Sequence, residues 1–373
     1  MARGRVSILI AALAVFGAAS CSRDRRPLDQ QLKEALDAGL RKYEVKGASA
    51  ALVFPDQSVR LVVSGLSHDT VPIRPDMLFA IGSITKNMVA TVVLQLVEEG
   101  VLSLEDPLHK WLPPYPKVDT NITIRQLLAH TSGLYMFWEN QRIWDDLIRY
   151  RNKVFSPEEV LSYLKDPHFP RGGGFRYSNT NYLLLAMIIT RATGSSLSAE
   201  LRKRFWQPLG LASAYLSLEE QIPDRLAHVW GDNFDNDGSF RDITFLPRAS
   251  HESITYGSAG LFMTAEDLAR WCQLLFEGKV LKPSSLDQML TVGKGGYGLG
   301  VQVRVFRRWL MGREKAFGHG GGNIGTMAYM WYLPEHHTSI ALMINAFNGK
   351  CINYIIKELV SITVEHLSSQ NSK

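Results

Sequence analysis

Segments that read as β-strands occur at both ends of this chain, and a block with mostly helical and loop signals lies between them. Residues 48–55 and 59–66 read as two strands joined by a polar turn. Three more strand-like segments lie towards the C-terminus, at 297–306, 325–334 and 338–347. The economical arrangement is one antiparallel sheet to which both ends of the chain contribute.

Two amphipathic helical segments flank these strands, one at residues 27–44 and one from about 350 to 367. They are expected to cover the sheet, while the helical block forms an inserted subdomain. The predicted fold class is therefore α/β of the α+β type, with an α/β part at about 27–80 and 255–373 and a helical part at about 81–254. A substrate site is expected in the cleft between the two parts.

The charge balance argues against a nucleic-acid partner. The 373 residues include 41 Lys and Arg and 36 Asp and Glu, which gives a net charge of +5. This excess is small and scattered, and it forms no basic stripe along one segment. The partner expected from the sequence is therefore a small molecule or a peptide, and the oligomeric state is left open.

The first residues carry the pattern of an export signal. Arg3 and Arg5 precede an apolar run at residues 6–20, which is shorter than the ~20 residues needed to span a bilayer. We expect residues 1–20 to be a signal peptide. The mature domain, residues 22–373, would then lie in the periplasm or the cell envelope.

The apolar run ends in "AASC", which resembles a lipoprotein processing site. We expect lipidation of Cys21 and attachment of the protein to the membrane through this lipid. Lipoprotein signals usually carry Leu or Val three places before the cysteine, and Ala18 stands there in this chain. Ordinary cleavage and an uncleaved anchor therefore remain alternatives.

A serine and a lysine lie three residues apart at the start of an apolar helical segment, as Ser83 and Lys86. Side chains at this spacing are neighbours on one face of a helix. A serine hydroxyl is a weak nucleophile until a base takes its proton. The helix N-terminus favours an oxygen anion, and burial would disfavour the charged form of the lysine. The pair is a candidate nucleophile and base.

Position distinguishes this pair from a second copy of the same pattern. Ser162 and Lys165 have the same spacing, but they lie near the end of a helical segment, where the helix dipole disfavours an anion. We interpret this second pair as part of a solvated face.

Two later stretches contain residue types that suit acyl transfer. Tyr177, Ser178 and Asn179 lie just before a helical segment. A tyrosine near positive charge could act as a phenolate or relay protons, and an asparagine amide can orient a substrate carbonyl. Taken alone, the stretch is better explained by an aromatic lid with an Asn or Ser cap on the following helix.

The second stretch places His319 before three glycines, Gly320, Gly321 and Gly322. Residues without side chains let a substrate lie along the backbone and accept hydrogen bonds from its N–H groups. The alternative is a glycine-rich bulge beside a surface histidine.

In this order, the three stretches resemble the motifs of the serine β-lactamase and penicillin-binding-protein superfamily, which are S-x-x-K, then Y-x-N or S-x-N, then K-[ST]-G or H-x-G. The tyrosine form of the second motif is similar to the class C β-lactamase branch, with its D-Ala-D-Ala carboxypeptidase, D-aminopeptidase and esterase relatives. "LLAHTSGL" at 127–134 is also similar to that branch. The resemblance covers about residues 30–365 and implies the β-lactamase/DD-peptidase-like fold.

The resemblance also implies a role for each motif residue. Ser83 would be the nucleophile that accepts the acyl group, and Lys86 and Tyr177 would share the general base and acid duties. Substrate would be held by Asn179, His319 and Gly321. The oxyanion hole would consist of the backbone N–H groups of Ser83 and Gly322.

One departure from the family pattern bears on the substrate. Class C β-lactamases and most penicillin-binding proteins have Lys in the third motif, where this chain has His319. Because histidine is only partly charged near neutrality, it binds a substrate carboxylate less firmly than a lysine does. We therefore expect weak β-lactamase activity and an ester, amide or peptide substrate.

Two functions remain as alternatives from the sequence. The first is a secreted serine hydrolase that forms an acyl-enzyme on Ser83. The second is a catalytically idle relative that binds cell-wall peptide or a protein partner in the same cleft. No cofactor is expected, and none of the ten histidines is assigned to a metal. Cys272 and Cys351 lie in apolar helical segments and are expected to be buried thiols.

Overall fold

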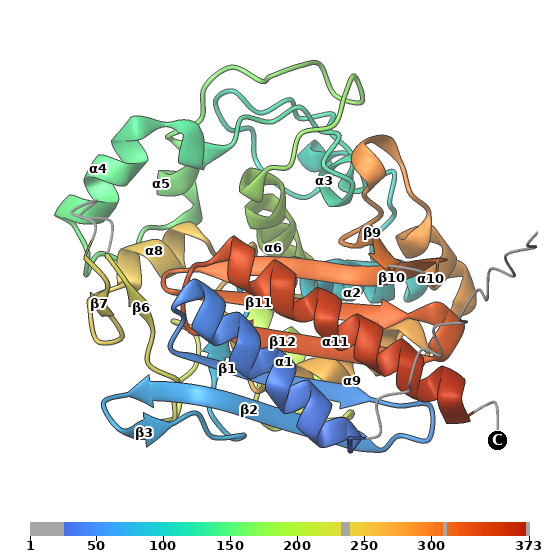
Figure 1. Cartoon of the computed structure of the whole chain (residues 1–373). Coiled ribbons are helices and arrows are strands. Elements are labelled where there is room, and N and C mark those ends of the chain that lie inside the picture. Colours follow the sequence, from blue (N-terminus) through green and yellow to red (C-terminus); the bar gives the residue numbers. More distant parts are fainter. Residues whose placement is uncertain (1–25, 233–238, 309–311, 371–373) are drawn as a thin grey trace, which may run out of the picture.

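The computed structural model describes residues 26–232, 239–308 and 312–370 (Figure 1). Its largest element is a seven-stranded antiparallel sheet with the strand order β3-β2-β1-β12-β11-β10-β9. The strands are β1 (Gly47–Val53), β2 (Val59–His68), β3 (Val71–Pro72), β9 (Gln302–Arg308), β10 (Gly312–Asn323), β11 (Thr326–Leu333) and β12 (Thr338–Ile344).

The two ends of the chain meet in the middle of this sheet, where β1 pairs with β12. Ala50 lies opposite Leu342, and Leu52 lies opposite Ile340. All residues of both strands are buried, which is expected for strands that are covered on both faces. The predicted antiparallel sheet built from both ends is confirmed, and so is the fold class.

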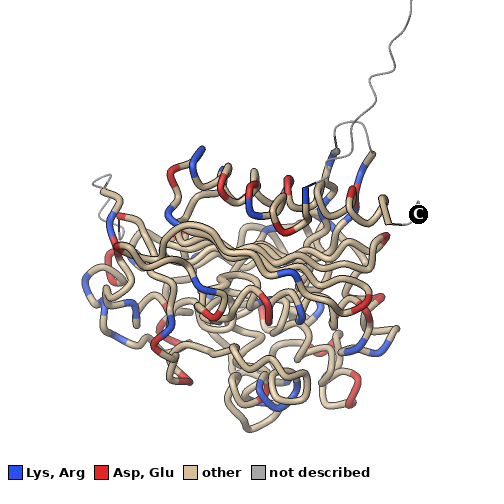
Figure 2. The backbone as a smooth tube through the Cα atoms, turned by 60° about the horizontal axis from the view of Figure 1, so that its bottom comes forward, with Lys and Arg blue, Asp and Glu red and all other residues tan. Residues whose placement is uncertain are grey.

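Helices α1 (Leu28–Tyr43) and α11 (Gly349–Gln370) cover one face of the sheet (Figure 1). Leu36 of α1 and Ile355 and Leu359 of α11 are fully buried in the core between these helices and the sheet. Figure 2 shows the sheet nearly edge-on, with the two terminal helices on one side and the rest of the chain on the other. The apolar faces of both helices explain this packing.

The opposite face of the sheet is covered by α9 (Ala265–Phe276), which packs against β1, β11 and β12. Beside it lies α2 (Thr85–Glu98), most of whose residues are buried. The indole N–H of Trp271 donates to Asn87 Oδ1 and joins the two helices. At its N-terminal end, α2 continues from the 3₁₀ turn Gly82–Ile84, and this turn packs directly against β10.

Beyond α2, short helices and loops form the remainder of this side of the molecule. The other helices are α3 (Ile124–Leu128), α4 (Gln141–Arg149), α5 (Pro157–Leu161), α6 (Asn179–Thr193), α7 (Leu197–Leu201), α8 (Ala249–Ile254) and α10 (Pro283–Leu290). Two small sheets accompany them, one of β4 (Phe79–Ala80), β8 (Leu261–Met263) and β5 (Tyr215–Leu216), and one of β6 (Trp230–Gly231) and β7 (Arg241–Asp242).

Local sequence signals define several helix ends correctly. Ser156 caps α5 in a capping box with Glu159, and Thr264 caps α9. Gly194 ends α6 in the left-handed conformation, with φ of 70°. Cys272 and Cys351 are buried free thiols, as predicted.

The largest difference from the sequence prediction is strand β10. The sequence left open whether the glycine-rich stretch after Phe317 is a backbone surface for substrate or a bulge, and glycine weakens a strand. In the structure it continues β10 and pairs with β11, with Gly321 opposite Ala328. The predicted strand 297–306 begins only at Gln302.

The predicted signal peptide and Cys21 lie outside the described residues. Within residues 26–232, 239–308 and 312–370, no helix combines the length and apolarity that crossing a membrane requires.

Candidate active site

Ser83 and Lys86 lie at the junction of the 3₁₀ turn and α2, against β10. Lys86 Nζ is 2.9 Å from Ser83 Oγ and donates a second hydrogen bond of 2.8 Å to the carbonyl of Ser258, in the turn after α8. The lysine is fully buried, and this burial holds its pKa well below its ordinary value. A neutral amine at this distance can accept the serine proton.

Tyr177 is the third group at this position, although nearly a hundred positions separate it from Ser83 in sequence. Its ring centroid lies 4.9 Å from Lys86 Nζ, and it lines the same cavity as Ser83. Burial raises the pKa of Tyr177, and the interaction with the Ser83 hydroxyl opposes this effect only in part. The side chain is therefore a neutral phenol rather than the phenolate considered from the sequence, and it is suited to relay a proton.

The glycines of β10 allow the strand to approach Ser83 closely. A Cβ atom on Gly321 would lie 1.9 Å from the carbonyl oxygen of Ile81, and one on Gly82 would lie 2.6 Å from the backbone nitrogen of Gly322. Gly82 also has a φ of 52°, which favours glycine. A side chain at either position would separate β10 from the turn that carries Ser83.

This close approach brings two backbone N–H groups to one place. Gly320 N donates to the side chain of Gln302, on the side of β10 where pairing with β9 has ended. Since backbone amides alternate along a strand, the N–H of Gly322 points to the same side as that of Gly320. This arrangement is compatible with the predicted oxyanion hole of the Ser83 and Gly322 N–H groups, which remains a prediction.

His319 differs from its predicted role. The ring is fully buried, and its Nδ1 donates to the carbonyl of Gly320 at 2.6 Å while Nε2 accepts a 2.8 Å hydrogen bond from Tyr297. Burial lowers the pKa of His319 to about 3. A neutral ring with both nitrogens occupied offers no charge to a substrate carboxylate, so the expected substrate contact of His319 is not available in this structure.

Asn179 is the first residue of α6 and follows Tyr177 closely. Its Oδ1 atom is buried and has no hydrogen-bond partner among the described residues. A buried acceptor of this kind can take a hydrogen bond from a substrate.

A cavity of about 570 Å³ opens on the Tyr177 side of Ser83. Ser83 and Tyr177 line it together with Tyr297, Gln302, Arg304 and Gly320. The cavity connects Ser83 to the surface. We call it the leaving-side cavity. A candidate metal cluster of three or more His, Cys, Asp or Glu residues was not found in the part of the chain that the structure describes.

Two residues of the site were not singled out from the sequence, although His130 lies within the family-like stretch at 127–134. His130 Nδ1 accepts hydrogen bonds from Ser178 N at 3.1 Å and from Asn181 Nδ2 at 3.0 Å, and its ring lies 4.3 Å from that of Tyr177. It positions the loop that carries Tyr177. Tyr297 acts similarly on His319 through its hydroxyl. Both contacts join segments that are far apart in the chain, which a local pattern does not reveal.

Comparison with known proteins agrees with this geometry. A family model described as Beta-lactamase matches residues 30–353. Esterase EstB of Burkholderia gladioli is 29% identical over 307 residues, which cover 74% of this chain and 77% of the esterase. The penicillin-binding protein PbpX of Bacillus subtilis is 28% identical over 229 residues, which cover 60% of this chain and 53% of PbpX. The chain thus spans about half the length of PbpX.

A solved structure extends the likeness to three dimensions. The D-amino acid amidase from Ochrobactrum anthropi SV3, in complex with L-phenylalanine amide, superimposes with a TM-score of 0.78. The alignment has 26% sequence identity and covers 91% of this chain and 99% of the amidase.

Proposed function

Because this chain belongs to the Beta-lactamase family, we propose that it is a serine hydrolase that forms an acyl-enzyme on Ser83. The substrate class is an ester, amide or peptide, as the names of the esterase and amidase relatives suggest. The observation that carries the proposal is the buried Lys86 amine, which lies 2.9 Å from Ser83 Oγ. A buried lysine beside a serine is poised to be a base and serves no evident purpose for folding.

In the first half of the reaction, Ser83 Oγ bonds to the substrate carbonyl carbon and its proton passes to Lys86 Nζ. The carbonyl oxygen becomes an anion and is held by the N–H groups of Ser83 and Gly322. When the carbonyl re-forms, the bond to the leaving group breaks, and the leaving atom takes the proton through the Tyr177 hydroxyl. The acyl group then remains as an ester on Ser83.

Water completes the reaction by the same groups in reverse. It loses a proton through Tyr177 and Lys86 while its oxygen bonds to the acyl carbon, and Ser83 Oγ leaves with that proton restored. The products are the carboxylic acid and the free enzyme. Since His319 is neutral, this chain lacks the cation with which relatives that have Lys in the third motif meet a β-lactam carboxylate, and β-lactamase activity is expected to be weak.

An active-site label tests the proposal. A fluorophosphonate should modify the wild-type protein and fail to modify Ser83→Ala. Ser162→Ala is the matched control, because Ser162 also lies three residues before a lysine but caps the end of α5 on the surface. If the protein is not labelled and does not turn over p-nitrophenyl esters, nitrocefin or D-Ala-D-Ala peptides, the alternative is favoured, a catalytically idle relative that binds cell-wall peptide or a protein partner.

We also propose that the protein is exported and held at the membrane by a lipid on Cys21. The proposal rests on the basic start, the apolar run and the "AASC" sequence. In bacteria that express the full chain, an alkyne-tagged fatty acid should label the wild type, which should fractionate with membranes. Cys21→Ser should lose the label. A protein that is unlabelled and soluble from the start would contradict lipidation.

A further inference from the structure

If the protein is the hydrolase proposed above, the leaving group and the acyl group of its substrate lie on opposite sides of Ser83. The inference therefore rests on the proposed function. The leaving atom must receive its proton from Tyr177, so the leaving group has to occupy the leaving-side cavity that Tyr177 lines. With the carbonyl oxygen held by Ser83 and Gly322, the acyl substituent must point the other way, past Gly322.

A second cavity, of about 430 Å³, begins at that place. It lies between the β10–β11 turn, the β6–β7 hairpin and the helical side of the molecule, and Gly322 forms part of its wall. Large apolar side chains provide most of the remaining lining, namely Trp138, Trp144, Trp230, Ile243, Ile324 and Phe347. Asp232 and His251 are its ionisable lining residues. We name this space the acyl-side cavity.

The aromatic wall on the helical side is held in place before any ligand binds. The rings of Trp138 and Trp144 lie 4.6 Å apart, and the indole N–H of Trp144 donates to the carbonyl of Trp138 at 2.8 Å. Trp138 also stacks on His251, with ring centroids 5.8 Å apart. Preformed apolar walls of this kind bind a ligand with little cost of ordering.

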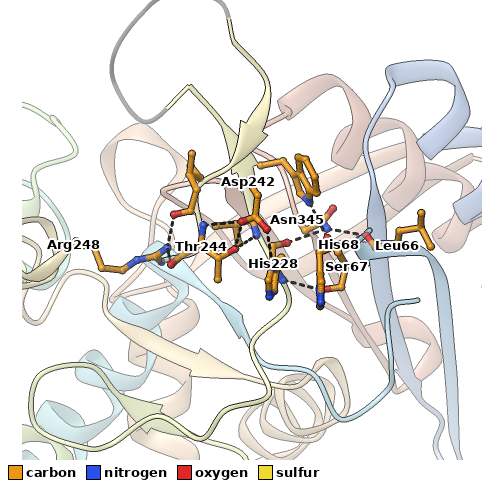
Figure 3. Close-up of polar contacts among 11 residues, drawn as sticks. Leu66, Ser67, His68, His228, Asp242, Thr244, Arg248 and Asn345 are labelled. Atoms are coloured by element: carbon orange, nitrogen blue, oxygen red, sulfur yellow. Dashed lines mark hydrogen bonds and ion pairs between the residues drawn. The ribbon is translucent and has the colours of Figure 1, made fainter. Parts of the chain in front are cut away.

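The opposite wall, the β6–β7 hairpin, is fastened to the large sheet by polar contacts (Figure 3). The indole N–H of Trp230 donates to the carbonyl of Ser67 at 2.8 Å, and Asn345 Nδ2 donates to the carbonyl of His228 at 3.0 Å. Across the hairpin, His228 Nδ1 lies 2.5 Å from Asp242 Oδ2. These contacts fix Trp230 at the edge of the cavity.

One lining residue has an unused hydrogen-bond donor. Asn323 is 5% exposed, and its Nδ2 atom has no partner among the described residues. Its side chain lies on the same face of β10 as Gly321, which touches the Ser83 turn, because the two residues are two positions apart in a strand. A buried donor without an acceptor is costly, which is a sign that the cavity is built for a ligand.

We propose that the acyl-side cavity binds the acyl part of the substrate and selects large aromatic acyl groups over small ones. The walls present flat indole and phenyl surfaces, on which an aromatic ring packs better than a methyl group does. The acyl-side cavity therefore sets the substrate class of the hydrolase, as an ester, amide or peptide of an arylalkyl carboxylic acid.

Two esters with the same leaving group test this inference. The kcat/KM for p-nitrophenyl phenylacetate should exceed that for p-nitrophenyl acetate by about tenfold or more in the wild type, which is the usual effect of filling an apolar pocket. Phe347→Ala should lower this ratio by about fivefold to tenfold. Phe347 is 68% exposed, so its removal should leave the fold intact.

Phe245→Ala is the matched control. Phe245 is 78% exposed and packs on His228, behind the hairpin and outside the acyl-side cavity, so its removal should leave the ratio unchanged. Trp138→Ala provides a second lining variant and should lower the ratio as Phe347→Ala does.

The outcomes separate this inference from the proposed function. If Ser83 reacts with a fluorophosphonate but the ratio is one or less in the wild type, or equal in wild type and both lining variants, the inference is wrong and the hydrolase assignment stands. Fluorophosphonate labelling of Ser83 without turnover of p-nitrophenyl phenylacetate would also show that the inference about the acyl-side cavity is wrong. If neither labelling nor turnover occurs, the proposed function itself fails.

Discussion

At the scale of single residues, burial shifts the two proton-transfer groups in opposite directions. It lowers the pKa of Lys86 and raises the pKa of Tyr177. A neutral amine is a base and a neutral phenol is an acid. These opposite shifts favour Lys86 as the first proton acceptor, and the following measurement tests that role.

The acylation rate is expected to rise with pH and then level off. Lys86 accepts a proton only in its neutral form, which predominates above its lowered pKa and is lost as the pH falls below it. Single-turnover acylation measured between about pH 5 and pH 9 should show this rise, and Lys86→Ala should lose a factor of about 10²–10⁴. A flat profile, or a loss below tenfold, would contradict the assignment of Lys86.

Lys86 should also make the stability of the protein depend on pH. Its pKa is lower in the folded state than the ordinary value of 10.5, so the unfolded state binds one proton more in the interval between these two pKa values. In that interval the free energy of unfolding rises by about 1.4 kcal/mol per pH unit. Lys86→Met removes this contribution.

The measurement is urea unfolding of wild type and Lys86→Met at several pH values from neutral to alkaline. Relative to the wild type, Lys86→Met should be most stable at the lower pH values and should lose this advantage as the pH rises. A difference that is independent of pH would show that Lys86 keeps its ordinary pKa in the folded state.

At the scale of elements, the site depends on the contact between strand β10 and the turn Gly82–Ile84. The strand supplies the N–H of Gly322, and the turn supplies Ser83. Neither element can move aside without separating the backbone N–H groups of Ser83 and Gly322, and Gly321 leaves no room for a side chain, because its Cβ would lie 1.9 Å from the Ile81 carbonyl oxygen. Glycines weaken an isolated strand, but here they are needed because the turn Gly82–Ile84 packs too closely against β10 to leave room for side chains.

Gly321→Ala is expected to reduce kcat/KM by about 10²–10³, the usual effect of losing one oxyanion donor. Its Cβ would lie 1.9 Å from the Ile81 carbonyl oxygen, so β10 has to shift. Gly349→Ala, at the start of α11, is the control, because its Cβ meets no atom within 4 Å. If Gly321→Ala kept full activity, the Gly322 N–H could not be an oxyanion donor in the geometry described.

At the scale of the whole molecule, one residue holds the two ends of the chain and the acyl-side cavity together. Asn345 follows β12 and is fully buried. Its Oδ1 accepts from Gly47 N at 2.7 Å, and its Nδ2 donates to the carbonyls of Leu66 and His228 (Figure 3). These contacts link β12 to β1, to β2 and to the segment that leads into the hairpin.

Asn345→Ala should lower the free energy of unfolding by about 2–4 kcal/mol, because it leaves three backbone groups without their partner. Chemical denaturation of the variant gives this value, with Asn152→Ala, at an exposed position, as the control. A loss no larger than that of the control would mean that water replaces the three hydrogen bonds at no cost.

Much of the fold could be predicted because it depends on short-range patterns. Short apolar segments bounded by turn residues identified β1, β2, β11 and β12. Residues such as Ser156, Gly194 and Thr264 marked the ends of their helices through contacts with near neighbours. The resemblance of three ordered motifs to one family implied that Ser83, Lys86 and Tyr177 share one site.

What the sequence determined alone was therefore the set of elements and the chemical groups available to them. The tertiary structure decided that a glycine-rich stretch is a strand, that His319 is buried and neutral, and that His130 and Tyr297 position the site. Each of these depends on hydrogen bonds or packing between segments that are distant in the chain. Burial and pairing of this kind are properties of the assembled molecule, because no window of sequence contains both partners.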